Sequence, residues 1–135
     1  MMYGHDYEDA LEMVRYSEHH RGWDDSMIQD YIEKPLGIRQ YKIMRNDLHE
    51  PLMFATWAFP SEEQVHDYVG TTYFPTDGYK GGGKDVWLVD FIAKKGYTRK
   101  GFLELKRMFM RSGYKKAYWF RPETRKLGWH MLKGK

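Results

Sequence analysis

The sequence predicts an α/β fold: a single-domain sandwich in which a largely antiparallel central sheet is flanked by helices. Three observations favour this class. Segments with apolar residues at helical spacing alternate with short β-rich segments along the chain. One β-rich segment, 85–93, is almost continuously apolar in its first half, as expected at the centre of a sheet. The 135 residues, 41% of them hydrophobic, suffice for one domain, 1–135, with a sizeable core.

The N-terminal part of the chain predicts two helices. Residues 6–16 carry apolar side chains at helical spacing, so a first helix is expected there, with His19 and His20 at or just beyond its end. Asp24 is a suitable cap for a second helix that continues to residue 32. Pro35 and Gly37 are expected to stop this helix, and the chain then becomes extended.

A hairpin and a short helix follow. The β-rich runs 39–45 and 52–59 are joined by a polar loop, as expected of an antiparallel hairpin. Ser61 and Gln64 have the spacing of a capping box, which predicts a short helix to about residue 68. The glycine-rich stretch 71–84 is predicted to be a loop within the domain.

The remaining elements alternate again between strand and helix. A central strand is expected over 85–93, then a glycine-bounded basic loop over 94–101 and a helix to about residue 111, which Gly113 ends. The helix is expected to bury Phe102, Leu105 and Phe109. Two last strands are predicted over 115–120 and 127–132.

Composition limits the chemistry and the location. The chain has no cysteine, which excludes disulfides, thiolate metal ligands and thiol nucleophiles, and favours a reducing compartment. The acidic N-terminus lacks the features of a signal peptide, and no apolar run approaches the roughly 20 residues of a membrane span. The sequence therefore predicts a soluble, cytoplasmic protein.

Charge is divided unevenly along the chain. Residues 1–70 hold 6 Lys/Arg and 14 Asp/Glu, whereas residues 71–135 hold 16 Lys/Arg and 5 Asp/Glu. A basic C-terminal half suits an acidic partner, such as a carrier protein, a phosphorylated cofactor or nucleic acid, although solvation explains surface charge equally well. The six histidines lack the spacing of a metal site, so no metal is expected.

Between Ser17 and Arg121 the chain resembles the toxin-activating lysine acyltransferases, because it has several of their short motifs in the same order and at the same spacing. These enzymes fatty-acylate RTX haemolysin-type protoxins and use acyl carrier protein as the donor. The motifs are Ser17 with His20-Arg21-x-Trp23, Pro35, Gln40-Tyr41, Pro51 through Trp57-Ala58, Gly83-x-x-x-Trp87-x-x-Asp90-x-Ile92-Ala93, and Gly96. Lys94-Lys95 departs from the family, which usually has an apolar residue or proline there.

The resemblance implies a fold and a pair of active residues. The family's fold is like that of the GNAT acetyltransferases, and its required histidine and aspartate fall on His20 and Asp90. In a GNAT-like fold the loop after the central strand meets the pantetheine or pyrophosphate of the donor. The residues expected to contact substrate or donor are Ser17, Arg21, Lys95, Gly96, Arg99 and Lys100.

The implied reaction moves an acyl group from an acyl carrier protein or coenzyme A thioester to a protein lysine, with no tightly bound cofactor. A lysine amine has a pKa of about 10.4, so a positioned base is useful, and histidine suits this task. Asp90 either orients the histidine or holds the acceptor lysine, and a covalent acyl-histidine is a further alternative. Without this context, a histidine at a helix end is more simply explained by the helix dipole.

Two other functions compete with catalysis. The altered loop also suits a non-catalytic binding or assembly module of the same fold, such as a component of a phage particle, in which case the protein would be found in the virion. Basic and aromatic residues alternate in the C-terminal half, which is a feature of nucleic-acid binding, but no nucleic-acid motif is present and this interpretation is not favoured. A homodimer or larger assembly is compatible with either function.

Overall fold

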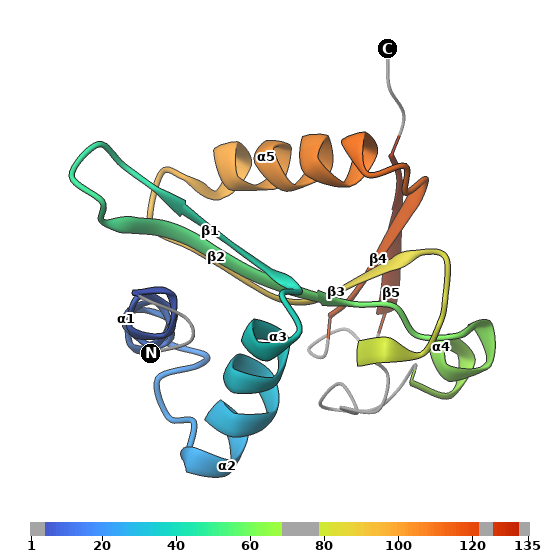
Figure 1. The fold of residues 1–135 in the computed structure, drawn as a ribbon, viewed down its shortest axis with the longest axis horizontal. Helices are drawn as coiled ribbons and strands as arrows, with labels where there is room; N and C mark the ends of the chain where they lie inside the picture. The colour runs from blue at the N-terminus through green and yellow to red at the C-terminus, as the bar shows by residue number, and fades with distance from the viewer. Residues whose placement is uncertain (1–4, 69–78, 122–125, 133–135) are drawn as a thin grey trace. The chain divides into compact units, whose positions relative to one another are not determined.

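The computed structural model describes residues 5–68, 79–121 and 126–132 (Figure 1). Its helical segments are α1 (Asp6–Tyr16), α2 (Asp25–Ile28), the π-helical turn η1 (Gln29–Glu33), α3 (Lys34–Gly37), α4 (Glu62–Tyr68) and α5 (Thr98–Arg111). Its strands are β1 (Tyr41–Arg45), β2 (Pro51–Ala58), β3 (Val86–Ala93), β4 (Lys116–Arg121) and β5 (Lys126–Met131). The predicted α/β class is confirmed.

The strands are hydrogen-bonded in the order β1-β2-β3-β4-β5. β1 pairs with β2 and β4 with β5 in antiparallel fashion, while β3 and β4 are parallel, as a strand–helix–strand connection through α5 requires. The chain forms two compact units, one of residues 1–56 and 90–104, the other of residues 57–89 and 105–135. The single domain expected from the sequence stays a prediction.

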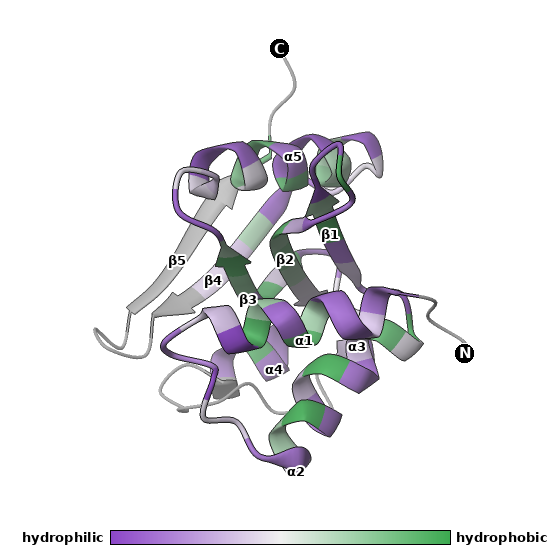
Figure 2. Cartoon of the chain, turned by 90° about the vertical axis from the view of Figure 1, so that its left-hand side faces the viewer, coloured by the Kyte–Doolittle hydropathy of each residue, from purple (hydrophilic) through white to green (hydrophobic). Residues whose placement is uncertain are grey.

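The core of the first unit lies between its helices and the sheet. Figure 2 shows hydrophobic residues along β2 and β3, and Phe54 and Ile92 of these strands are buried. The inner face of α1 is buried as well, through Ala10, Met13 and Val14. Burying these apolar side chains stabilises the position of α1, which carries the candidate site at its C-terminal end.

The second helical segment is longer than predicted: Pro35 does not stop it, and it ends at Gly37, the other predicted stop. The helix continues through a π-helical turn over Gln29–Glu33, where the N–H of Lys34 bonds the carbonyl of Gln29. Proline lacks an N–H and clashes with the carbonyl four residues earlier in a regular helix. The wider π turn just before it relieves this conflict, and Pro35 is buried in the first turn of α3.

Ionic hydrogen bonds join α1 to β1 within the first unit. The guanidinium of Arg45 donates to Asp6 at 2.7 Å and to Asp9 at 2.9 Å, and the hydroxyl of Tyr41 also donates to Asp6. Burial alone would raise the pKa of Asp6, but the hydrogen bonds from Tyr41 and Arg45 outweigh it and lower this pKa. Burial and the neighbouring Asp6 raise the pKa of Tyr41 to about 12.

Helix α5 begins at Thr98, so the loop predicted over 94–101 ends earlier than expected. Gly101 lies inside the helix and is buried, and a Cβ there would stand 2.7 Å from Cγ of Met53. This glycine therefore permits close packing rather than a turn. The prediction that Phe102 is buried is wrong: it is 41% exposed, although its ring packs against that of Phe91 on β3, with centroids 4.9 Å apart.

The second unit confirms several local predictions. Ser61 and Gln64 form the expected capping box, with reciprocal bonds of 2.9 and 3.1 Å at the start of α4. Phe109 is buried and packs edge-on against Trp57, with ring centroids 5.0 Å apart. Gly113 ends α5 with a positive φ, as predicted. Residues 71–78 of the predicted glycine-rich loop lie outside the described part of the chain.

Candidate active site

The site begins where α1 ends. Ser17 has an extended backbone and its N–H still bonds Met13, so it is the C-cap of the helix. Its carbonyl then accepts hydrogen bonds from the N–H groups of His20 and Arg21, at 3.2 and 2.9 Å. These bonds fold residues 17–21 into a tight turn. The turn places the imidazole of His20 over the sheet, whereas His19 is exposed to solvent.

Asp90 approaches His20 from the sheet. It lies in the middle of β3 and belongs to the same compact unit as His20. Nε2 of His20 is 2.9 Å from Oδ1 of Asp90, and the two side chains are only 15% and 14% exposed. A carboxylate in this partly buried position is costly unless it is hydrogen-bonded, and the imidazole supplies that bond.

The second ring nitrogen of His20 is also hydrogen-bonded. Oγ of Ser17 lies 2.6 Å from Nδ1. The indole of Trp23 packs against the edge of the imidazole, with ring centroids 4.8 Å apart and planes at 62°. Ser17, Trp23 and Asp90 therefore fix the ring on three sides, and the sequence predicted two of these three as site residues.

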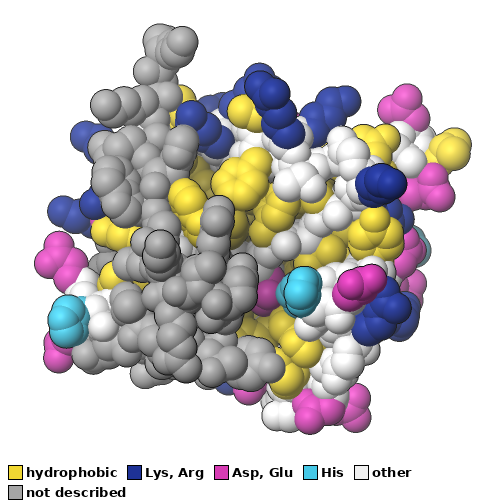
Figure 3. Space-filling model, turned by 180° about the vertical axis from the view of Figure 1, so that it is seen from behind, with side chains coloured by type: hydrophobic (Ala, Val, Ile, Leu, Met, Phe, Trp, Pro, Cys, Tyr) yellow, Lys and Arg dark blue, Asp and Glu magenta, His cyan; other side chains and the backbone are white. Residues whose placement is uncertain are grey.

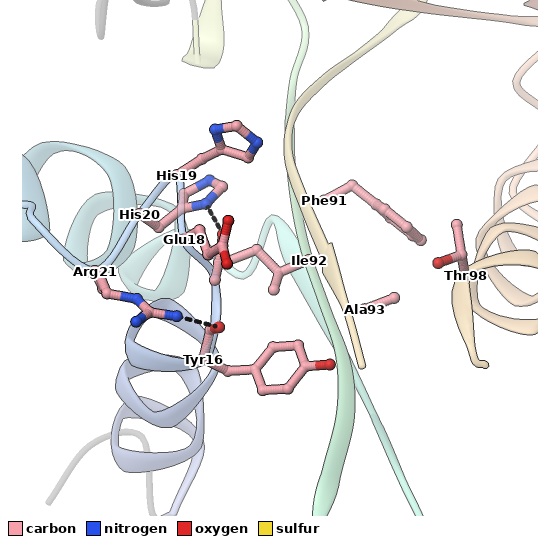
Figure 4. A pocket seen from close by; sticks show the side chains of 10 residues that line it. Tyr16, Glu18, His19, His20, Arg21, Phe91, Ile92, Ala93 and Thr98 are labelled. Atoms are coloured by element: carbon pink, nitrogen blue, oxygen red, sulfur yellow. Dashed lines mark hydrogen bonds between the residues drawn. The ribbon is translucent and has the colours of Figure 1, made fainter. Parts of the chain in front are cut away.

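A pocket of about 630 Å³ opens beside His20, a volume within the range of small-molecule sites. Figure 4 shows the turn after α1 on one side of it and the end of β3 on the other. Its wall combines polar and apolar groups. The lining residues are Tyr16, Ser17, Glu18, His19, His20, Arg21, Phe91, Ile92, Ala93 and Thr98.

The predicted contact residues divide into two groups. Ser17 and Arg21 line the pocket, although the guanidinium of Arg21 also reaches the carbonyl of Tyr16 at 3.4 Å, as a helix cap would. Lys95, Gly96, Arg99 and Lys100 do not line it. The first two lie in the loop after β3, and the other two lie in the first turns of α5 because the helix begins at Thr98.

The basic loop after β3 is tied to α1. Nζ of Lys94 forms an ion pair of 3.0 Å with Glu12, and the N–H of Lys95 donates to the hydroxyl of Tyr16 at 2.9 Å. Gly96 has a φ of +89°, a conformation that favours glycine. Lys95, Arg99 and Lys100 are exposed, and Figure 3 shows Lys and Arg side chains gathered at the edge where α5 lies. This loop and helix are positively charged next to the pocket.

Sequence reasoning missed Tyr16, Phe91 and Thr98 as lining residues. Tyr16 and Phe91 were assigned to a helix end and a strand interior, and only the pairing of these segments in space brings them to one pocket. Among the described residues, no group of three or more His, Asp or Glu side chains is arranged to hold a metal ion. Within the same residues, no helix is long and apolar enough to cross a membrane.

Comparisons with known proteins agree on family and fold. A family model described as HlyC, RTX toxin acyltransferase family, matches residues 9–127. No curated protein matches the sequence. A solved structure of the GphF GNAT-like decarboxylase in complex with isobutyryl-CoA aligns with a TM-score of 0.60 and 9% identity, over 84% of this chain and 60% of that chain.

A second solved structure gives the same result. The loading GNATL domain of CurA from Lyngbya majuscula aligns with a TM-score of 0.57 and 16% identity, over 85% of this chain and 59% of that chain. The present chain therefore spans about three fifths of the length of these two proteins. At such low identity the likeness establishes the fold, which is GNAT-like, as predicted.

Proposed function

Because the chain belongs to the RTX toxin acyltransferase family, we propose that it transfers an acyl group from a thioester donor to a protein lysine, with His20 as general base and Asp90 as its partner. The observation that supports this proposal most directly is the 2.9 Å bond between Nε2 of His20 and Oδ1 of Asp90 beside a pocket. The bond joins the two residues that the family resemblance identified.

The base is needed because of the acceptor. A free lysine has a pKa of about 10.4, so its amine is almost wholly protonated near neutral pH and cannot attack a carbonyl. Histidine has an ordinary pKa of about 6.5 and accepts a proton in this range. A positioned base of this kind typically contributes a factor of about 10² to 10⁴ in rate. His19 is exposed and is not bonded to Asp90, so His20 is the better candidate of the adjacent pair.

Asp90 supports the base in two ways. Its carboxylate fixes the orientation of the imidazole, and its negative charge stabilises the imidazolium that forms when His20 takes a proton. The bond to Nε2 uses one carboxylate oxygen, Oδ1. We therefore favour a role for Asp90 in supporting His20 over a role in binding the acceptor lysine directly.

The donor is proposed to be an acyl carrier protein or coenzyme A thioester. One protein of similar fold was solved with isobutyryl-CoA, and both donors carry phosphate next to a pantetheine arm. The exposed cations Lys95, Arg99 and Lys100 lie on the loop and helix that follow the Asp90 strand, so they would attract such a donor. The apolar side chains Phe91 and Ile92 line the pocket and suit the first carbons of an acyl chain.

A pocket beside the His20–Asp90 pair favours an enzyme over a binding or assembly module, because a module does not need a hollow at this position. The cytoplasmic or virion location and a homodimer stay predictions, since they depend on partners that lie outside this chain.

The test is intact-mass analysis of lysine-bearing acceptor proteins after incubation with the purified protein and carrier-protein or CoA thioesters from acetyl to palmitoyl. We expect a mass gain equal to the acyl group with at least one donor. His20→Ala should abolish the gain, and His19→Ala, which removes the neighbouring exposed imidazole, is the matched control and should retain it. A folded wild-type protein that transfers no acyl group from any donor would sink the proposal.

A further inference from the structure

Both ring nitrogens of His20 already have partners. Nε2 is 2.9 Å from Oδ1 of Asp90, and Nδ1 is 2.6 Å from Oγ of Ser17. A carboxylate only accepts hydrogen bonds, so Nε2 must carry the ring proton of a neutral imidazole. Nδ1 then holds the lone pair, and the hydroxyl of Ser17 donates to it. The geometry therefore assigns the tautomer and identifies Nδ1 as the basic nitrogen.

This arrangement places Ser17 in front of the base. An amine that loses a proton to His20 has to reach Nδ1, and that nitrogen is already covered by the Ser17 hydroxyl at a short distance. Ser17 lines the pocket, and it is only half-buried, so its oxygen is accessible to a second hydrogen-bonding group. A serine hydroxyl has one proton to donate and two lone pairs to accept with, so it can hold both partners at once.

Building on the proposed function, we propose that Ser17 is a further catalytic residue, which carries the proton from the acceptor amine to His20. Its oxygen accepts a proton from the amine nitrogen while its own proton moves to Nδ1 of His20. The imidazolium so formed keeps its bond to Asp90. The transfer regenerates the hydroxyl, so Ser17 is unchanged at the end of the step.

The proton balance of the reaction closes around this relay. The nitrogen–carbon bond forms as the amine attacks the thioester carbonyl, and the carbon–sulfur bond breaks. A lysine that arrives as an ammonium ion loses two protons from its nitrogen. The first passes through Ser17 and His20 to the solvent before the attack, and the second passes through Ser17 to His20 as the nitrogen–carbon bond forms. The departing thiolate takes one proton, and the imidazolium returns to its neutral form. The products are an amide, a thiol and one proton released to the solvent, and no oxidant or further reactant is consumed.

The same geometry would also suit Ser17 as a nucleophile, but the chemistry of the donor argues against that role. A thioester is more reactive toward amines than an oxygen ester, so an acyl-Ser17 ester would make the second transfer harder. The chain contains no cysteine that would keep the acyl group as a thioester on the protein. Direct attack by the amine, with Ser17 moving only the proton, avoids this loss of reactivity.

The backbone of Ser17 is held in a way that suits the relay. Its N–H bonds Met13 at 3.1 Å and its carbonyl accepts from His20 and Arg21, so the backbone groups are fixed and only the side chain is left to turn. Rotation about the Cβ–Oγ bond is enough to direct the hydroxyl proton at Nδ1 and a lone pair of the oxygen at the amine. The relay therefore needs no movement of the chain.

The experiment compares Ser17→Ala with Ser17→Thr in the acyl-transfer assay, with folding checked by circular dichroism. We expect Ser17→Ala to lower kcat by about 10²-fold, within the usual range for acid–base catalysis, with KM for the donor nearly unchanged. Ser17→Thr keeps a hydroxyl at the same position and should recover most of the lost rate.

Nitrogen-15 NMR of the His20 ring distinguishes proton transfer from mere support of the ring. The wild-type ring should show Nε2 protonated, and in Ser17→Ala the bond to Asp90 should preserve this tautomer while activity is lost. Loss of the tautomer together with the activity would overturn the relay and leave Ser17 a purely structural role. Detection of a hydroxylamine-sensitive acyl group on Ser17 would overturn it in favour of a nucleophile.

The experiments can disprove the relay and the proposed function separately. If Ser17→Ala transfers acyl groups at the wild-type rate while His20→Ala does not, the relay is wrong and the acyltransferase function stands. If the folded wild-type protein transfers nothing from any donor, both are wrong.

Discussion

The hydroxyl of Tyr16 accepts a hydrogen bond of 2.9 Å from the N–H of Lys95, which ties the last residue of α1 to the loop that follows β3. The two segments that border the pocket are thereby joined by a bond that is independent of the His20–Asp90 pair. Because Tyr16 lines the pocket and Lys95 lies in the basic loop, this contact couples the position of the pocket wall to that of the proposed donor-binding residues.

Tyr16→Phe should loosen the loop without unfolding the protein. The substitution removes only the acceptor oxygen, so we expect the free energy of unfolding to fall by about 0.5–1.5 kcal/mol in urea titration. Hydrogen exchange at the Lys95 amide should become faster. The Leu48 amide, which bonds the side chain of Asn46 in the hairpin loop, is the internal control. Unchanged exchange at Lys95 would contradict the role assigned to Tyr16.

Asp90→Asn removes the negative charge of this side chain but keeps its size and shape. The amide is nearly the same size and still has an oxygen to accept from Nε2 of His20, so the melting temperature should stay close to that of the wild type. Because the neutral amide cannot stabilise an imidazolium, kcat for acyl transfer should fall by about 10²-fold or more. An active Asp90→Asn enzyme would show that the carboxylate charge is dispensable.

Gly101→Ala should destabilise the protein despite the better helix propensity of alanine. The added Cβ would lie 2.7 Å from Cγ of Met53 and 3.3 Å from Cζ of Phe91, and Met53 is fully buried. Overpacking costs about 1–3 kcal/mol, which exceeds the roughly 1 kcal/mol gained by replacing glycine in a helix. Gly22→Ala, where the new methyl group meets nothing within 4 Å, is the control for urea titration. Equal stability of the two variants would contradict the close packing of α5.

The Asp6–Arg45 contact should make stability depend on pH in the acid range. The folded-state pKa of Asp6 lies below its ordinary value of 3.8. The ionised carboxylate therefore contributes its full stabilisation of the folded state above that pH. This stabilisation is lost as pH falls through the lowered pKa. Asp6→Asn should therefore be less stable than the wild type at pH 7, and the difference should shrink toward pH 2. Asp47→Asn, on the exposed hairpin loop, should follow the wild-type curve in the same urea titrations.

The sequence predicted most elements because their signals are local. The capping box of Ser61 and Gln64, the apolar run of β3 and the glycine after α5 each act within a few residues, and each was found where expected. The errors arose where tertiary packing decides. The sequence predicts a loop boundary at Gly101, because nothing in the neighbouring residues reveals that Met53 lies against it. The sequence predicts a helix stop at Pro35, because the π turn that accommodates this proline has no clear sequence pattern.

The candidate site was predictable only in part for the same reason. His20 and Asp90 were identified through the family resemblance, but their 2.9 Å bond joins residues 70 positions apart, and no local pattern reports such a distance. The bond between Ser17 and Nδ1 of His20 spans three positions, yet it depends on the side-chain rotamers within the turn. The pocket residues Phe91 and Thr98 carried no sequence signal, since both types occur throughout ordinary strands and helices.

The separation of 70 residues between His20 and Asp90 also determines when the site can form during protein synthesis. The turn with Ser17 and His20 leaves the ribosome first, together with α1. Its carboxylate partner follows only after the whole hairpin, α4 and the glycine-rich stretch have been translated. A nascent chain that stops before β3 therefore carries an imidazole without its partner, so every product of premature termination upstream of residue 90 lacks the paired base.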